Sequence, residues 1–237
     1  MSNQTASLQK TARFAGFLYF LVAVFSFFSI MYVPSQIMVK GEAARTFQNL
    51  LTHEFLFRAG ITANLVNFVV FLFLAFFLYK LFRPIDEPLS KILLVSVAVQ
   101  LPVVFVMEAF NFSALMVAKE MVYESADVTQ KQDMAMLLLK LNDYGTIILM
   151  LFWGIWLIPF GQLALKSGYL PKVIGIFLIA GGIAYILECL DYILLDRKLS
   201  FITNYTSFFH SVAEISTVVW LLVKGVQQKH KEAAFSK

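Results

Sequence analysis

Residues 60–82 read GITANLVNFVVFLFLAFFLYKLF, and Lys80 is their only charged side chain. At about 1.5 Å per residue, a helix of this length crosses the roughly 30 Å hydrocarbon core of a bilayer. Because lipid offers no partner for backbone N–H and C=O groups, such a stretch crosses a membrane as a helix, whose backbone hydrogen bonds are all internal. The stretch therefore predicts a transmembrane helix and an all-α fold.

Five further stretches share this composition. The six predicted spans lie at Phe14–Val33, Gly60–Phe82, Ile92–Ala118, Tyr144–Leu165, Val173–Leu194 and Ser207–Val226. The chain has 237 residues, of which 59% are hydrophobic and 14% charged, against about 45–50% and about 25% in soluble domains. No linker rich in Gly or Pro divides it. We therefore predict a polytopic integral membrane protein with a single membrane domain over residues 1–237, and we exclude a soluble enzyme.

Six spans place both termini on the same side of the membrane. The loops and tails on that side carry more basic than acidic residues, whereas the two kinds nearly balance on the other side. The positive-inside rule then predicts cytoplasmic N- and C-termini, in the cytoplasmic (inner) membrane. The net charge of +4 is typical of such loops, so the expected partner is the lipid bilayer and not nucleic acid. The oligomeric state is left open.

The connections between the spans differ in length. The short turns Arg83–Pro88 and Ser167–Pro171 contain the Pro and Gly residues that end helices, so they predict antiparallel neighbouring helices. On the other side, apolar residues recur at helical spacing over Ala44–Leu56 and predict a surface helix. Residues Met134–Leu141 are expected to extend the fourth span outward.

Three carboxylates, Glu108, Glu188 and Glu214, lie within predicted spans. An ionisable residue there costs about 2.5–3.5 kcal/mol, so it usually faces the interior of the bundle or a wet cavity. Counting the rise per residue places all three, together with His210, in the outer third of the membrane. Asp143 and Arg58 are expected at the outer ends of the fourth and second spans.

Polar residues also recur at spacings of three or four, which places them on one face of a helix. His210 and Glu214 are four apart, and Glu188 and Asp191 are three apart. We predict that these faces line one pocket open to the outer side, with Arg58 as the counter-charge. Its candidate ligand-binding residues are Arg58, Asn64, Asn67, Glu108, Asn111, Asp143, Glu188, Asp191, His210 and Glu214.

Three interpretations of this pocket stay open. In the first, the polar groups form a structural network that holds the helices together. In the second, which we predict as the function, the pocket binds or transports a small polar or amphiphilic ligand, such as a lipid. In the third, His210 and Glu214 hold a divalent metal that activates water in an intramembrane hydrolase. No other cofactor is expected, no catalytic residue is indicated, and a non-enzymatic role is favoured.

Small residues mark expected sites of close helix approach, at Gly181-Gly182, Gly145 and Gly154. Cys189 is the only cysteine, so the chain forms no intrachain disulfide and has no cysteine cluster for zinc or iron–sulfur.

The chain resembles a known family nearly from end to end. The shared segments are TARFAGFLY (residues 11–19), LFRAGI (56–61), Tyr144-Gly145, FWG (152–154), KSGYLPKVIG (166–175), Ala213-Glu214 and WLLVKGV (220–226). They are similar to the mostly bacterial six-span membrane proteins catalogued as domain of unknown function 4386. The resemblance implies a six-helix inner-membrane protein and brings no established activity. It also implies a histidine just before Tyr144-Gly145, where this chain has Asn142-Asp143, and this departure weakens the metalloenzyme interpretation.

Overall fold

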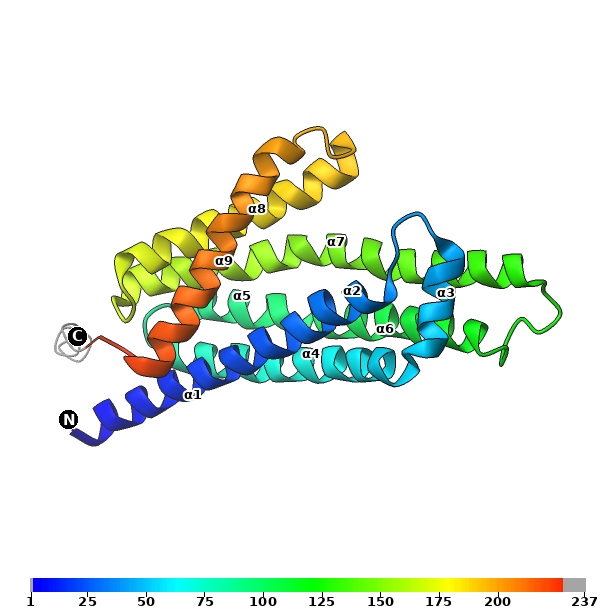
Figure 1. Cartoon of the computed structure of the whole chain (residues 1–237). Helices are drawn as coiled ribbons and strands as arrows, with labels where there is room; N and C mark the ends of the chain where they lie inside the picture. Colours follow the sequence, from blue (N-terminus) through cyan, green and yellow to red (C-terminus); the bar gives the residue numbers. More distant parts are fainter. Residues whose placement is uncertain (1, 228–237) are drawn as a thin grey trace. The chain divides into compact units, whose positions relative to one another are not determined.

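The computed structural model describes residues 2–227, with residues 2–5, 200 and 202–207 described by their backbone alone. All regular structure in this range is helical, which confirms the all-α prediction. The elements in chain order are α1 (Ser2–Ser26), the π-helix η1 (Phe27–Tyr32), α2 (Val33–Ile37), α3 (Ala43–Thr52), α4 (Glu54–Phe82), α5 (Glu87–Ala98), α6 (Gln100–Ala118), α7 (Val128–Ser167), α8 (Lys172–Leu195) and α9 (Ser200–Val223) (Figure 1).

Several of these helical stretches are long and apolar enough to cross a membrane. Within the described residues there are five, at Ala6–Ile37, Glu54–Phe82, Glu87–Ala118, Val128–Ser167 and Lys172–Leu195. They confirm a multi-pass membrane protein. The predicted sixth span corresponds to α9, in which the fully described residues form a shorter apolar helix, Phe208–Val223.

The described residues form two compact units. Unit 1 contains those within 1–20, 70–100 and 147–237, and unit 2 contains those within 21–69 and 101–146. The units are described separately below.

The predicted connections are confirmed. α4 ends at Phe82 and α5 begins at Glu87, while α7 ends at Ser167 and α8 begins at Lys172. The helix expected within Ala44–Leu56 corresponds to α3, and the fourth span is part of the longer helix α7, whose 40 residues correspond to about 60 Å of helix. α7 begins at Val128, well before the predicted boundary at Tyr144. The side of the membrane on which these parts lie stays a prediction.

The third predicted span is interrupted between α5 and α6 at Val99. Pro102 has no backbone N–H to donate to the carbonyl four residues earlier, so the helical hydrogen-bond ladder breaks here. In unit 1, the buried Gln100 side chain donates a hydrogen bond of 2.7 Å to the Ser96 carbonyl. This bond satisfies a carbonyl group near the break without water.

Glycines bring α7 and α8 together in unit 1, as the sequence predicted for Gly154 and Gly182. A Cβ atom added to Gly154 would lie 2.5 Å from the Gly182 carbonyl oxygen, and one added to Gly161 would lie 2.6 Å from the Gly175 oxygen. The pairing of 154 with 182 and 161 with 175 makes these helices antiparallel. α8 and α9 form a second antiparallel pair (Figure 1), where Gly181 faces the backbone of His210.

We expect Gly154→Ala to destabilise the protein by about 1–3 kcal/mol, because the added methyl group meets backbone and overpacks the helix contact. Chemical unfolding in detergent micelles would measure the free energy of unfolding. Gly145→Ala is the matched control, since its methyl group would meet the flexible Met107 side chain in unit 2. Equal losses in both variants would contradict a backbone contact at Gly154.

Asp86 organises the turn between α4 and α5. Its carboxylate accepts a hydrogen bond of 3.0 Å from the Leu89 backbone N–H, which caps α5, and one of 2.6 Å from the Lys166 ammonium group. The Lys166 hydrogen bond, followed by that from Leu89, lowers the pKa of the Asp86 carboxyl below its ordinary value.

A lowered folded-state pKa means that Asp86 contributes stability above the unfolded-state pKa, near 3.9, and loses this contribution as the pH falls through the folded-state value. Asp86→Asn keeps a capping group but removes the charge. We expect this variant to melt below the wild type at pH 6, and the difference to shrink as the pH falls below the unfolded-state pKa and through the lower folded-state pKa of Asp86. A difference that is independent of pH would contradict the ion pair.

Candidate functional site

The ten predicted ligand-binding residues are divided between the two compact units. Unit 2 contains Arg58, Asn64, Asn67, Glu108, Asn111 and Asp143, and unit 1 contains Glu188, Asp191, His210 and Glu214. We name the groups around the two most connected carboxylates the Glu108 cluster and the Glu214 cluster. Their convergence on one pocket stays a prediction.

In the Glu108 cluster, two asparagines bind one buried carboxylate. The Nδ2 atom of Asn64 donates to Oε1 of Glu108 at 2.6 Å, and that of Asn111 donates to Oε2 at 3.0 Å. Glu108 is only 4% exposed. Asn142 is a third amide whose side chain interacts with this carboxylate. A carboxylate has about four acceptor positions, so it can still accept from a further donor.

Two serines that the sequence analysis missed support these asparagines. Asn67 donates a hydrogen bond of 2.9 Å to Ser26, and Ser29 lies 3.5 Å from the Asn64 side-chain oxygen. Ser29 lies within η1, and Ser26 immediately precedes it. Ser26 and Ser29 are three residues apart, a spacing that could have placed them on one helix face, but serines in an apolar span were not considered as candidates.

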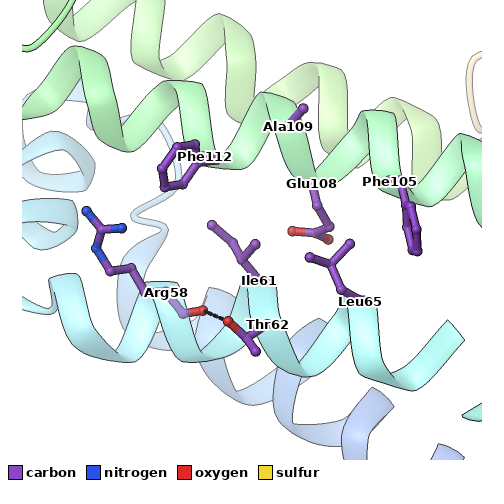
Figure 2. Close-up of a pocket in the computed structure, with 8 residues that line it drawn as sticks. All are labelled: Arg58, Ile61, Thr62, Leu65, Phe105, Glu108, Ala109 and Phe112. Atoms are coloured by element: carbon purple, nitrogen blue, oxygen red, sulfur yellow. Dashed lines mark hydrogen bonds between the residues drawn. The ribbon is translucent and has the colours of Figure 1, made fainter. Parts of the chain in front are cut away.

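Glu108 lies at the wall of a groove between α4 and α6. The groove has a volume of about 360 Å³, and its lining residues are Arg58, Ile61, Thr62, Leu65, Phe105, Glu108, Ala109 and Phe112. Figure 2 shows the Glu108 side chain pointing from α6 toward α4, with Arg58 and Phe112 at one end and Phe105 at the other. The lining positions of each helix are three or four apart, a signal that could have identified the groove from the sequence.

Arg58 has a nearer partner than the predicted pocket carboxylates. Its Nε atom lies 2.8 Å from Oε1 of Glu54, which also accepts from Lys119 at 2.7 Å. The guanidinium group lies 5.5 Å from the centre of the Phe112 ring, within the range of a cation–π interaction. Arg58, the cation at the end of the groove, is thus linked through Glu54 to a second cation, Lys119, outside the lining.

Asp143 does not line this groove. Its side chain is exposed, while the neighbouring Asn142 donates a hydrogen bond of 2.9 Å to the Met107 carbonyl. Gly145 lies against the Met107 side chain, so the predicted close approach at this glycine is confirmed.

In the Glu214 cluster, two tyrosines from other helices bind one carboxylate. The Tyr19 hydroxyl donates to Oε2 of Glu214 at 3.2 Å, and the Tyr185 hydroxyl donates to Oε1 at 3.0 Å. Tyr19 comes from α1 and Tyr185 from α8, so this carboxylate of α9 connects three helices of unit 1. Neither tyrosine was predicted as a site residue, because an isolated tyrosine in an apolar span also fits an anchoring or core role.

His210 faces Glu188 and Tyr185. Its ring stacks on Tyr185 with centroids 4.0 Å apart, and Nε2 lies 3.5 Å from Oε1 of Glu188. That distance allows an ion pair if the histidine is protonated. The buried Nε2 atom forms no hydrogen bond with any described residue.

Aromatic rings enclose the Glu214 cluster. The Trp156 ring packs edge to face against Tyr19, and the Trp153 ring packs in the same way against Tyr185. Such pairs contribute about 0.5–1.5 kcal/mol beyond their buried area. The cluster is therefore part of a packed aromatic core.

Asp191 performs a local structural task. It is buried, and its carboxylate accepts a hydrogen bond of 2.9 Å from the Leu199 backbone N–H. Its backbone carbonyl accepts from the Arg197 N–H at 3.1 Å. These bonds stabilise the turn from α8 to α9, in which Asp196 and Arg197 have positive φ values.

The predicted metal ligands His210 and Glu214 make the contacts given above. In the described part of the chain, no three His, Cys, Asp or Glu side chains are grouped as they would be around a metal ion. A metal-dependent activity stays a prediction.

The Glu214 cluster yields a prediction about stability. Tyr19→Phe and Tyr185→Phe should each lower the free energy of unfolding by roughly 0.6–1.7 kcal/mol, the range for side-chain hydrogen bonds in membranes. The double variant should lose more than the sum, because Glu214 then keeps neither donor. Tyr79→Phe in α4 is the control, since its hydroxyl forms no hydrogen bond to another described residue. Unfolding in micelles would test this, and additive or absent effects would contradict it.

The comparison with known proteins identifies a family. A family model described as "Domain of unknown function (DUF4386)" matches residues 14–225, nearly the whole chain. No curated protein and no solved structure matches the chain.

Proposed function

The chain belongs to the DUF4386 family, and on that premise we propose that it is a six-span membrane protein that binds an amphiphilic ligand in the groove between α4 and α6. The family description carries no activity, so the proposal depends on the groove. The observation that carries it is Glu108, a buried carboxylate inside a span that also lines a groove.

The sixth span of this proposal is α9. Its 24 residues correspond to about 36 Å of helix, enough to cross the hydrocarbon core. α9 also pairs with α8 along its length, as neighbouring spans do. With six spans and the excess of basic residues near the termini, both termini are cytoplasmic and the membrane is a bacterial inner membrane.

Glu108 determines which polar group of a ligand the groove can bind. Among the described residues no basic side chain forms an ion pair with it, and the side chains that bind it are neutral amides. A ligand amine or hydroxyl group can donate to the remaining acceptor positions of the carboxylate. An amine also supplies the missing positive charge, which makes its hydrogen bond about twice as strong as a neutral one.

The apolar part of the ligand is set by the walls of the groove. Ile61, Leu65, Phe105 and Phe112 provide aliphatic and aromatic surface on both helices. The Phe105 and Phe112 side chains are also among the exposed apolar residues of α6, so the groove continues the surface that faces lipid. Arg58 at the end of the groove offers donors to an acceptor group of the ligand. An amphiphilic amine fits these features together.

Three probes with the same chain, dodecylamine, dodecanol and dodecanoate, test this chemistry. We expect dodecylamine to bind the purified protein most tightly, and Glu108→Gln to weaken that binding roughly tenfold while changing dodecanol binding little. Thermal melting at graded probe concentrations measures both effects. Because all variants share one detergent, differences between them do not arise from the micelle.

Glu124→Gln is the matched control, because Glu124 is an exposed carboxylate of unit 2 outside the groove. It should bind all three probes as the wild type does. If Glu108→Gln binds dodecylamine like the wild type, or merely unfolds more easily with no change in probe preference, Glu108 is structural and the proposed function is wrong.

A further inference from the structure

Unit 1 contains a second pocket, formed where α1 begins and α9 ends. Its volume is about 510 Å³, within the range of about 300–1,000 Å³ that is usual for ligand sites. Its lining residues are Gln9, Arg13, Trp220, Val223, Lys224, Val226 and Gln227. Both charged side chains of this lining are cationic, so the pocket favours an anion.

Hydrogen bonds between chain segments hold the pocket in shape. The Gln9 side chain donates to the Lys224 carbonyl and accepts from the Val226 N–H at 3.2 Å. The Gln227 N–H donates to the Tyr169 carbonyl at 2.9 Å, in the turn between α7 and α8. Gly225 lies between Lys224 and Val226, the two residues whose backbone Gln9 contacts. Its φ of +68° is a conformation that glycine adopts without strain.

The carbonyl groups at the end of α9 would ordinarily repel an anion, because a helix C-terminus carries partial negative charge. Here they already have donors. Arg13 donates to the Val223 carbonyl at 3.4 Å, and Gln9 donates to that of Lys224. The guanidinium group has four further N–H donors, so it can bind an anion while it keeps this contact.

Two further groups are available in the pocket. The Lys224 ammonium group forms no hydrogen bond or ion pair with another described residue, and its side chain is exposed. The indole Nε1 of Trp220 is buried and has no hydrogen-bond acceptor in the described part of the chain. An indole N–H is a donor only and usually finds a partner when buried. A ligand oxygen in the pocket would supply that acceptor.

The pocket also has an apolar side, formed by Trp220, Val223 and Val226. It lies at the end of the apolar stretches Ala6–Ile37 and Phe208–Val223, at the level where a bilayer changes from hydrocarbon to headgroups and where tryptophan is enriched. We propose that Arg13, Lys224 and the Trp220 N–H bind the phosphate group of an anionic phospholipid, whose acyl chains continue along α9.

This site is separate from the groove of unit 2 and shares no residue with it. Its two cations are Arg13 of α1 and Lys224 at the C-terminal end of α9. Each cation in direct contact with the phosphate group contributes a charge-assisted hydrogen bond of at least about 1 kcal/mol, which corresponds to about a fivefold change in affinity per residue. A basic residue outside the pocket makes no such contact.

Native mass spectrometry of the full chain can count the lipids that stay bound, with phosphatidylglycerol as the anionic probe and phosphatidylcholine of the same acyl chains as the neutral one. We expect the wild type to retain one phosphatidylglycerol with at least about tenfold preference. Lys224→Ala should lose about fivefold in this affinity, and Arg13→Ala with Lys224→Ala about 25-fold. Trp220→Phe keeps an aromatic ring, although a smaller one, and removes the N–H, and it should weaken binding severalfold.

Lys91→Ala with Lys172→Ala is the matched control, because it removes two exposed cations of unit 1 that do not line the pocket. Its preference for phosphatidylglycerol should equal that of the wild type. The proposal is wrong if the control loses as much as the pocket variants, or if Lys224→Ala, which removes no described contact, binds like the wild type. Glycerol 3-phosphate that binds as tightly as phosphatidylglycerol would also overturn it, since the site would then recognise a soluble phosphate.

Discussion

The lipid interior supplies no hydrogen-bond partners, so every polar group within a span must find its partner inside the chain or in a ligand. This constraint explains why the described chain is helical, and it also explains how its buried carboxylates are held. Glu108 accepts from Asn64 and Asn111, and Glu214 accepts from Tyr19 and Tyr185. In both clusters the donors are neutral, so neither carboxylate is neutralised by a hydrogen-bonded base.

The two clusters differ in what surrounds them. Aromatic rings enclose the Glu214 cluster, and glycines bring its helices so close that a single methyl group would not fit between the backbones. The Glu108 cluster instead borders a groove with apolar walls and with Arg58 at its end. The same chemical motif, a carboxylate with neutral donors, thus lies in a packed aromatic core in one unit and at the wall of a groove in the other.

The pocket between α1 and α9 follows from the same constraint, applied at a helix end. Carbonyl groups in the last turn of α9 lack helical partners, and side chains of α1 supply them. These side chains bring a guanidinium group beside Lys224 and Trp220, so the satisfaction of backbone groups also creates a cationic cavity. A membrane protein whose helix ends are held in this way can be sensitive to the charge of the surrounding lipid.

The sequence alone determined the all-helical membrane fold, the turns at Arg83–Pro88 and Ser167–Pro171, and the glycines at close helix contacts, because hydropathy, chain-breaking residues and small residues act locally. Only the tertiary structure decided that Tyr19, Tyr185, Ser26 and Ser29 join the polar clusters, because this outcome depends on which helices are neighbours. The Arg58–Glu54 pair, in contrast, joins residues four apart in one helix, so helical periodicity could have identified it. Helical periodicity fixes the face on which a residue lies, but the partner that this face meets is set by packing between distant segments.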